Sequence, residues 1–295
     1  MKTQNDNNRA VLPQTINIHL IRSCNFGCRY CYAVFAETGA SRIPPEHLLA
    51  ILDQISAAPL PEGSAPRKVN FAGGEPFLFP RLPEFICHAR RIGLVTSAVT
   101  NGSLLNVAVI AQLTGHLDIL ALSVDSLSPS VNAEIGRCGR GSPPGLDHYL
   151  SLAGMVRAAG IRLKVNTVVN RLNVHEDIGA GIARLAPFRW KLLQAKRIFG
   201  QNDAHFESLA VTDLEFSAYV ERNRRSVGSG VVVVPETADD MTASYSMIAP
   251  NGCFFDNSPG FYRYSRPIVE VGLLEAFSEV EFSEDQFLKR GGLYA

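Results

Sequence analysis

The chain has 295 residues, and its 28 basic and 28 acidic side chains leave no formal net charge. A neutral chain lacks the overall field that attracts a nucleic-acid polymer or an anionic membrane, so any anion site has to be local. No apolar run reaches the roughly 20 residues that span a bilayer, and the first ten residues carry no apolar core of a signal peptide. These features predict a cytoplasmic protein with neither a nucleic-acid nor a membrane partner.

Six short β-branched segments recur along the first 200 residues, with helical patterns between them. The segments are 16–21, 68–72, 94–99, 117–124, 161–169 and 189–198. Strands that alternate with helices predict a parallel sheet. We therefore expect an α/β fold, a partial (βα)6 barrel like the TIM barrel, whose functional loops follow the carboxyl ends of the strands.

The alternation weakens after about residue 200. A capping box from Thr212 to Glu215 predicts the start of a helix, the valines at 231–234 predict a short buried strand, and the remaining tail is irregular. We expect a disordered or flexible leader at 1–13, the barrel at 14–200, and an extension at 201–295 that packs on the barrel. A self-contained barrel predicts a monomer.

Three of the six cysteines lie within eight residues, directly after the first predicted strand. Cys24, Cys28 and Cys31 have the spacing Cys-x3-Cys-x2-Cys. Thiolates on one loop converge on an inorganic centre, either an iron–sulfur cluster or zinc. Structural zinc needs four ligands, and no second close Cys or His pair completes such a site. The pattern favours a four-iron cluster with one iron open to a ligand, and the alternative is three thiols without a metal.

The stretch SCNFGCRYCYAV closely resembles the cluster motif of the radical S-adenosylmethionine (SAM) superfamily, including Tyr30 before the last cysteine. The resemblance implies a [4Fe–4S] cluster and SAM as cofactors. Gly73, Gly74 and Glu75, in the segment GGEP after the second strand, look like the superfamily's element for the methionine amino group, although the same residues also fit an ordinary turn. Further candidates for the cofactor, each of which also fits a turn, are Thr100, Asn101, Ser123 and Asn166.

Polar residues two positions apart occur on three predicted strands. The pairs are Lys68 with Asn70, Lys164 with Asn166, and Arg189 with Lys191. Residues i and i+2 share one face of a strand, and apolar neighbours such as Trp190 would pack against helices, which turns the pairs inward. Four buried cations need compensating charge, and a nucleoside triphosphate with about four negative charges supplies it. Alternatively, some of the cations reach solvent at strand ends.

Several longer segments resemble the viperin family, in particular its prokaryotic members. They include KVNFAGGEPF, LKVNTVVNRLNVHED, RWKLLQ, VPETADDM and FLKRGGLY, and the match runs from about residue 14 to the C-terminus. The resemblance implies a radical SAM lyase that dehydrates a ribonucleoside triphosphate (CTP, UTP or GTP) to its 3′-deoxy-3′,4′-didehydro form, an antiviral, anti-phage chain terminator. A 5′-deoxyadenosyl radical would take the C4′ hydrogen, and an electron donor such as ferredoxin or flavodoxin is an implied partner.

The resemblance also assigns residues to the substrate. The triphosphate-binding positions match Lys68, Asn70, Lys164, Arg189 and Lys191, the active-site tyrosine matches Tyr245, and the segment that closes over the nucleotide contains Lys289 and Arg290. By pattern alone, this Lys-Arg-Gly-Gly end is a flexible tail. Two departures from the family are the Gly- and Pro-rich loop at 137–148 and a polar leader in place of the membrane-binding helix of animal members.

Two alternatives to this function stay open. The first is a radical SAM enzyme that acts on another substrate, such as a peptide or a free nucleoside. The second is a non-catalytic iron–sulfur module that senses redox state or scaffolds partners. A requirement for a triphosphate would exclude the first, and production of 5′-deoxyadenosine would exclude the second.

Overall fold

The computed structural model describes residues 12–294, so residues 1–11 of the predicted leader lie outside the described part of the chain. The parallel strands are β1 Thr15–His19, β2 Lys68–Ala72, β3 Val95–Thr100, β4 Ile119–Ser123, β5 Arg162–Val169, β6 Arg189–Gln194, β7 Val232–Glu236 and β8 Ser246–Ile248. They are followed by β9 Cys253–Asp256 and β10 Arg263–Pro267, which pair antiparallel.

Helices connect these strands. They are α1 Pro45–Ala57, α2 Leu82–Arg91, α3 Val107–Leu113, α4 Pro129–Ile135, α5 Leu146–Ala158, α6 Gly179–Leu185, α7 Asp203–Leu209, α8 Asp213–Val227, α9 Ile268–Val271, α10 Leu273–Ser278 and α11 Glu284–Lys289. Short 3-10 helices, η1 Ala36–Thr38 and η2 Pro76–Leu78, follow β1 and β2.

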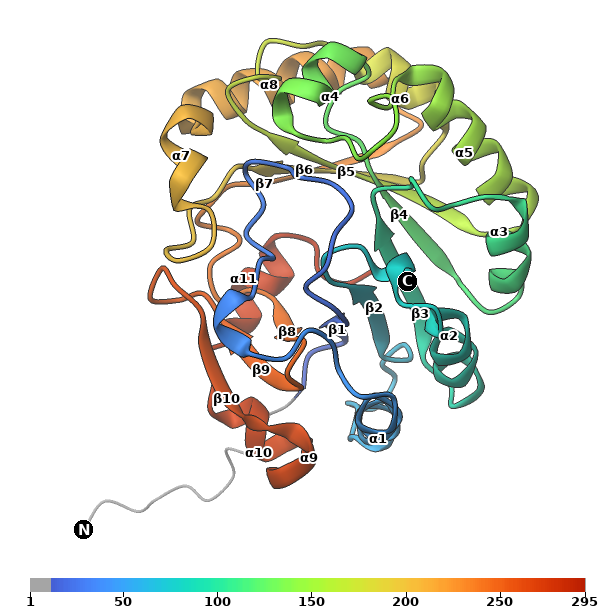
Figure 1. Ribbon diagram of the computed structural model, residues 1–295, viewed down its shortest axis with the longest axis vertical. Coiled ribbons are helices and arrows are strands. Elements are labelled where there is room, and N and C mark those ends of the chain that lie inside the picture. Colours follow the sequence, from blue (N-terminus) through green and yellow to red (C-terminus); the bar gives the residue numbers. More distant parts are fainter. Residues whose placement is uncertain (1–11, 295) are drawn as a thin grey trace.

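All the described strands belong to one sheet with the order β10-β9-β8-β1-β2-β3-β4-β5-β6-β7. The sheet is strongly curved, with α1 to α6 and α8 along its outer side (Figure 1). Because the order runs from one edge strand to the other, the barrel is open. The predicted α/β fold with a partial parallel barrel is therefore confirmed.

The core lies between the outer face of the sheet and the helices. Outward-facing strand residues such as Val69, Val165 and Trp190 are fully buried there, as the alternation of the strands predicts. The apolar face of α1 contributes Leu48 and Leu52, which are four residues apart and therefore lie on the same side of the helix. Apolar residues occupy the outer face, so the polar residues between them face the inside of the curve.

The six predicted strands are present, with ends that shift by one or two residues, except that β6 stops at Gln194 instead of residue 198. The reason is that its neighbour β5 ends at Val169, opposite Gln194, and offers no further partner. The capping box of α8 is present, with both bonds between Thr212 and Glu215 formed.

Two predictions for the end of the chain are wrong. The valine run was expected to be buried, but β7 is an edge strand and Val232 is 58% exposed. The tail was expected to be irregular, but it forms β8 to β10 and α9 to α11. Strands of three to five residues are too short to show a period, and β8 is stabilised by pairing with β1, far away in the sequence. The domain boundary at residue 200 stays a prediction.

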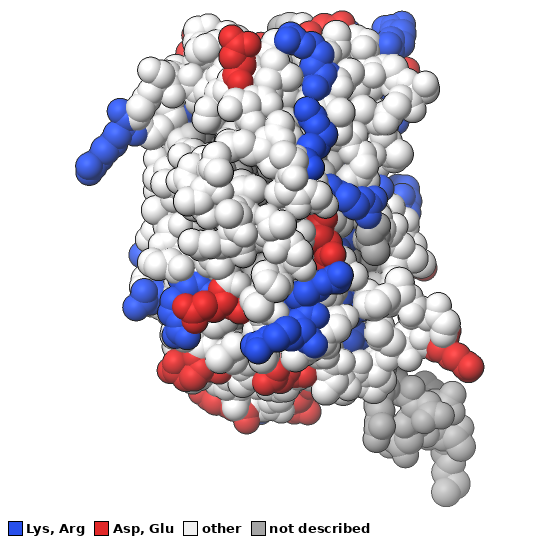
Figure 2. Space-filling view, turned by 90° about the vertical axis from the view of Figure 1, so that its right-hand side faces the viewer, with Lys and Arg blue, Asp and Glu red and all other residues white. Residues whose placement is uncertain are grey.

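Within residues 12–294, no helix is both long enough and apolar enough to span a membrane. On the face shown in Figure 2, basic and acidic side chains are interspersed over a largely uncharged surface. This distribution agrees with a chain whose charges cancel and whose cationic residues of interest lie inside.

Candidate functional site

A cavity on the inner side of the curved sheet collects residues that are far apart in the sequence. The predicted site residues that line it are Cys24, Cys28, Tyr30, Cys31, Asn70, Gly73, Gly74, Glu75, Thr100, Asn101, Ser123, Lys164, Asn166, Lys191, Tyr245 and Arg290. They follow the carboxyl ends of neighbouring strands or point inward from them, as expected for a barrel site. Lys68, Arg189 and Lys289 do not line this cavity and are placed below.

The three clustered cysteines sit at one end of the cavity. Among the described residues, no three Cys, His, Asp or Glu side chains meet closely enough to bind a single metal ion. A zinc ion would need its thiolates at about 2.3 Å from one point, whereas each thiolate of a four-iron cluster binds a different iron. Burial raises the pKa of the Cys28 thiol to about 12, so these thiols stay neutral unless a cation lies among them. Three thiols on one loop are a donor set that fits an iron–sulfur cluster.

Glycines hold the start of the cysteine loop against the turn after β2. A Cβ atom on Gly74 would lie 2.1 Å from the carbonyl oxygen of Ser23, and one on Gly73, whose φ is +146°, would lie 2.8 Å from that of Ile21. The backbone of Gly74 donates to Ile21 at 2.7 Å. The glycines were predicted to let a ligand approach, and in the structure it is the chain leading into the cysteine loop that approaches closely.

A buried ion pair fixes the other end of this loop. Asp125 accepts from the Tyr30 hydroxyl and from Arg137 Nε, the latter at 2.8 Å, and both charged groups are buried. The backbone of Gly27 also donates to Gly136 at 3.0 Å. Tyr30 therefore positions the loop through Asp125. Arg137 comes from the 137–148 loop that departs from the family pattern.

Glu75 lines the cavity, and neighbouring groups donate hydrogen bonds to its carboxylate. Thr100 Oγ1 donates to it at 2.7 Å and the backbone of Asn101 at 2.8 Å, and burial raises its pKa. No cation among residues 12–294 forms an ion pair with this carboxylate, which suits an ammonium ligand. Thr100 and Asn101 thus hold the carboxylate of Glu75 in place. The side chain of Asn166 lines the cavity with a buried Oδ1 that has no partner among the described residues, so this atom is available to a ligand.

Five cations that act on one another form what we call the cation cluster, and three of them line the cavity. Its members are Lys68, Lys164, Arg189, Lys191 and Arg290. Burial and the charges of the other four lower the pKa of Lys68 to about 6, and burial lowers that of Lys164 to about 7 and that of Lys191 to about 8. Burial and mutual repulsion thus disfavour the charged form of these amines. A bound polyanion would stabilise that form, so the cluster is suited to binding one.

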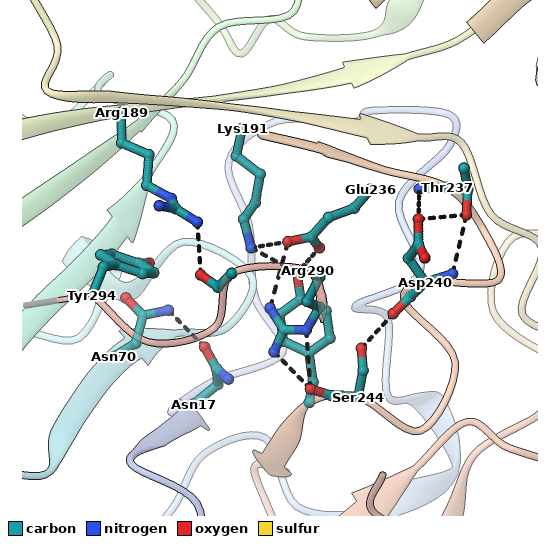
Figure 3. Close-up of polar contacts among 12 residues, drawn as sticks. Asn17, Asn70, Arg189, Lys191, Glu236, Thr237, Asp240, Ser244, Arg290 and Tyr294 are labelled. Carbon is teal, nitrogen blue, oxygen red and sulfur yellow. Dashed lines mark hydrogen bonds and ion pairs between the residues drawn. The ribbon is translucent and has the colours of Figure 1, made fainter. Parts of the chain in front are cut away.

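Tyr294, near the end of the chain, lies among three of these cations. Lys68 Nζ donates to its carbonyl oxygen at 2.6 Å, Lys164 Nζ donates to its hydroxyl at 2.8 Å, and the Arg189 guanidinium stands 4.4 Å from its ring centre. Arg189 also donates to the carbonyl of Gly291 at 2.7 Å (Figure 3). Lys68 instead lines a second pocket together with Leu293 and Tyr294, and Tyr294 also lines the main cavity.

Tyr245 and Glu236 meet the cluster from the opposite side. Lys191 Nζ donates to the Tyr245 hydroxyl at 3.0 Å and pairs with Glu236, which also accepts from that hydroxyl (Figure 3). Arg290 donates to the carbonyl of Ser244 at 2.6 Å and stacks 3.6 Å from the Tyr245 ring centre. Burial and the charge of Glu236 raise the pKa of Tyr245 far above its usual range, so the phenol keeps its proton.

Lys289 and Arg290 are neighbours with different positions. Arg290 is 6% exposed and lines the cavity, whereas the Lys289 side chain is 77% exposed and pairs with Asp240 at 3.1 Å. Because α11 ends between them, the two side chains point in different directions. The structure brings Arg290 to the cation cluster and leaves Lys289 outside the cavity.

Sequence reasoning missed three kinds of residue here. Asn17 lines the cavity from β1 and accepts from Asn70 at 2.9 Å, and the alternation argument, applied to β1, would have found it. Asp125 and Glu236 lie near strand ends. The sequence predicts that location but not which residues the two carboxylates contact. Tyr294 ends the segment FLKRGGLY that resembles the family, but the pattern alone gives no position for a residue of a tail.

Comparison with known proteins finds relatives that match most of this chain. A model of the radical SAM superfamily matches residues 18–179. An S-adenosylmethionine-dependent nucleotide dehydratase of Lacinutrix mariniflava is 37% identical over 95% of this chain, and the chain spans only 58% of that relative's length. One of Flammeovirga pacifica is 36% identical over 95% of both chains, and the dehydratase RSAD2 of Oncorhynchus mykiss is 32% identical over 97% of this chain and 81% of its own.

Solved structures show the same fold at low identity. Streptococcus suis SuiB bound to S-adenosylmethionine superimposes with a TM-score of 0.65 at 16% identity, over 83% of this chain and 61% of that one. The protein anSMEcpe with bound AdoMet gives a TM-score of 0.60 at 13% identity, over 82% of this chain and 73% of that one.

Proposed function

Because this chain belongs to the radical SAM superfamily, and within it to the S-adenosylmethionine-dependent nucleotide dehydratases, we propose that it dehydrates a ribonucleoside triphosphate. The product is the 3′-deoxy-3′,4′-didehydro nucleotide of CTP, UTP or GTP, a chain terminator that acts against phage. The superfamily uses a [4Fe–4S] cluster and SAM, and the donor set of the cysteine loop fits the former.

The charge of the cation cluster carries this proposal. The cluster holds five basic side chains, and the carboxylate of Glu236 is the largest opposing charge that acts on Lys164 and Lys191. When all five are protonated, as a bound polyanion favours, five positive charges and the one negative charge of Glu236 leave four positive charges in a buried site. A nucleoside triphosphate brings about four negative charges, which neutralise them, whereas a peptide or a free nucleoside leaves them unpaired.

The two ends of the cavity have separate tasks in this proposal. Cys24, Cys28 and Cys31 hold the cluster, while Glu75 and Asn166 bind SAM. When bound, a reduced cluster and SAM would supply the radical chemistry that removes the C4′ hydrogen of the ribose. The cation cluster holds the triphosphate so that the ribose lies between the two ends. The last residues of the chain, with Arg290 and Tyr294, exclude water that would intercept a radical.

Tyr245 carries a proton next to the triphosphate site. After loss of the C4′ hydrogen, the C3′ hydroxyl leaves as water when it receives a proton, and one electron from a ferredoxin or flavodoxin completes the reaction. The Tyr245 hydroxyl keeps its proton because burial and Glu236 raise its pKa. Because a raised pKa makes the phenol a weaker acid, transfer of this proton needs a nearby positive charge, and Lys191 Nζ, at 3.0 Å, supplies it by stabilising the oxygen from which the proton departs.

The test is an anaerobic reaction of the reconstituted protein with reductant, SAM and each of the four ribonucleoside triphosphates separately, read by mass spectrometry. We expect one nucleotide to lose the mass of water in step with the formation of 5′-deoxyadenosine. If 5′-deoxyadenosine forms equally with all four and no nucleotide changes, the substrate assignment is wrong and the radical chemistry stands. If no 5′-deoxyadenosine forms, the protein is a non-catalytic iron–sulfur module.

A further inference from the structure

Glu236 is a buried carboxylate that the reaction above does not use directly. It is the last residue of the edge strand β7, opposite Leu193 of β6, and it is fully buried. Burying a carboxylate is costly unless it is paired and hydrogen-bonded, so its partners indicate why it is there. The charges of Lys191 and Arg290 outweigh its burial and keep its pKa below the usual range.

The contacts of Glu236 form a closed arrangement (Figure 3). Oε1 pairs with Lys191 Nζ and lies 3.5 Å from Arg290 Nη1, and Oε2 accepts from the Tyr245 hydroxyl. Lys191 in turn donates to the same hydroxyl oxygen at 3.0 Å. One carboxylate thus links β6, the chain before β8, and the residue that follows α11.

Other buried carboxylates of the described chain have different partners. Asp125 pairs with Arg137 beside the cysteine loop, and Asp256 pairs with Arg263 on the antiparallel strands. Glu75 accepts only neutral donors at the cofactor end of the cavity. Glu236 is therefore placed to act on the cation cluster and on Tyr245 at the same time.

We propose that Glu236 is a positioning residue that sets the orientation of the Tyr245 hydroxyl and holds Lys191 and Arg290 beside it, an inference that rests on the proposed function. A phenol hydroxyl that donates to a carboxylate and accepts from an ammonium has its rotation fixed by both contacts. Without the carboxylate, only the Lys191 contact remains, so the hydroxyl proton has no fixed direction and the timing of proton delivery relative to radical formation is lost.

The variant Glu236→Gln separates positioning from anion binding. Glutamine keeps the shape and removes one negative charge, so the site becomes more positive and should bind a polyanion at least as tightly. We expect inorganic tripolyphosphate, titrated calorimetrically at pH 6.5 into the reconstituted protein with SAM, to bind with equal or higher affinity. Turnover of the nucleotide should fall about ten-fold or more, and the ratio of 5′-deoxyadenosine to dehydrated nucleotide should rise. As a control, Glu221→Gln removes an exposed carboxylate of α8 that pairs with Arg224.

A double-mutant cycle with Tyr245→Phe tests whether Glu236 acts through the hydroxyl. If it does, the double variant has the same turnover and product ratio as Tyr245→Phe alone, because the two effects are not additive. Glu236→Asp keeps the charge but shortens the side chain, so it should reproduce the changed ratio with little effect on tripolyphosphate affinity. This variant also decides the question if Glu236→Gln does not fold.

Three outcomes would overturn the inference. They are additive effects in the cycle, an unchanged product ratio in both Glu236 variants, and a joint loss of affinity and turnover in folded Glu236→Gln, which would make Glu236 part of the anion site itself. The activity of the wild-type protein distinguishes failure of the proposed function from failure of the inference about Glu236. If it dehydrates none of the four nucleotides, the proposed function fails, whereas the inference fails alone if the wild type is active and the variants behave in one of these three ways.

Discussion

Lys191 is the residue at which the anion site and the tyrosine meet. Its ammonium contacts both Glu236 and Tyr245, and burial lowers its pKa to about 8. It lies on β6, away from the cysteine loop at the opposite end of the cavity. Changes at this residue should therefore affect the nucleotide and not the cluster.

For Lys191→Ala we expect the KM for the nucleotide to rise by about 10- to 100-fold, because a charge-assisted hydrogen bond contributes about 1.5–3 kcal/mol. Iron and sulfide content should stay at the wild-type level. Steady-state kinetics and elemental analysis measure the two quantities. The control Arg225→Ala removes an exposed cation of α8. Loss of iron from Lys191→Ala would contradict the assigned role.

Arg290 and Lys289 offer a matched comparison one residue apart. Arg290 lines the cavity and is buried, while Lys289 is exposed and pairs with Asp240. We expect Arg290→Ala to raise the KM for the nucleotide by about ten-fold or more, and Lys289→Ala to raise it by a clearly smaller factor, because a surface pair contributes about 0–1 kcal/mol. Equal effects would show that Lys289 turns toward the phosphates when the nucleotide binds.

At the scale of elements, the turn after β2 supports the cysteine loop. Gly74 and the residues before Cys24 are in backbone contact, with Glu75 N donating to the Ser23 carbonyl at 2.9 Å. No side chain fits between them, since a Cβ on Gly74 would lie 2.1 Å from the Ser23 oxygen. The turn therefore fixes where the loop leaves β1.

Gly74→Ala should displace the cysteine loop, lower the iron bound per chain by at least about half, and reduce the free energy of unfolding by about 1–3 kcal/mol through overpacking. Iron analysis after reconstitution and urea unfolding measure these effects. Gly154→Ala in α5 is the control, because its Cβ meets no atom within 4 Å and alanine favours a helix by about 1 kcal/mol. Wild-type iron content in Gly74→Ala would show that the loop adjusts without this turn.

At the scale of the whole molecule, the curved sheet brings cations from three strands and from the end of the chain close enough to repel one another. Burial and neighbouring cations lower the pKa of Lys68 to about 6, and burial lowers that of Lys164 to about 7. Above those values the two amines are largely neutral in the free protein. A bound polyanion raises both values again, since it stabilises the charged form.

Binding of the nucleotide should therefore take up protons. The affinity is greatest below about pH 6, where both amines are already charged, and is lost as the pH rises through the free values toward the raised values of the complex. Between about pH 7.5 and 9 we expect the affinity to fall by about ten-fold per pH unit for each proton taken up. Calorimetry in buffers of different ionisation enthalpy measures the protons, and Lys68→Met should lower their number. A pH-independent affinity would contradict this coupling.

The sequence by itself determined the features that depend on local spacing. Three cysteines on one loop indicated the metal centre, and the two-residue alternation of Lys164 with Asn166 and of Arg189 with Lys191 indicated polar faces inside a parallel barrel. These features are readable because a strand repeats every two residues and a loop motif needs only its own residues.

Only the tertiary structure decided which distant groups meet. It brought Glu236 from an edge strand to Lys191 and Tyr245, and it seated Tyr294 among the cations. It also sent Arg290 inward and Lys289 outward from adjacent positions. Such contacts depend on the order and curvature of the whole sheet, and on the cost of burying each charge unpaired, neither of which is encoded in a local pattern.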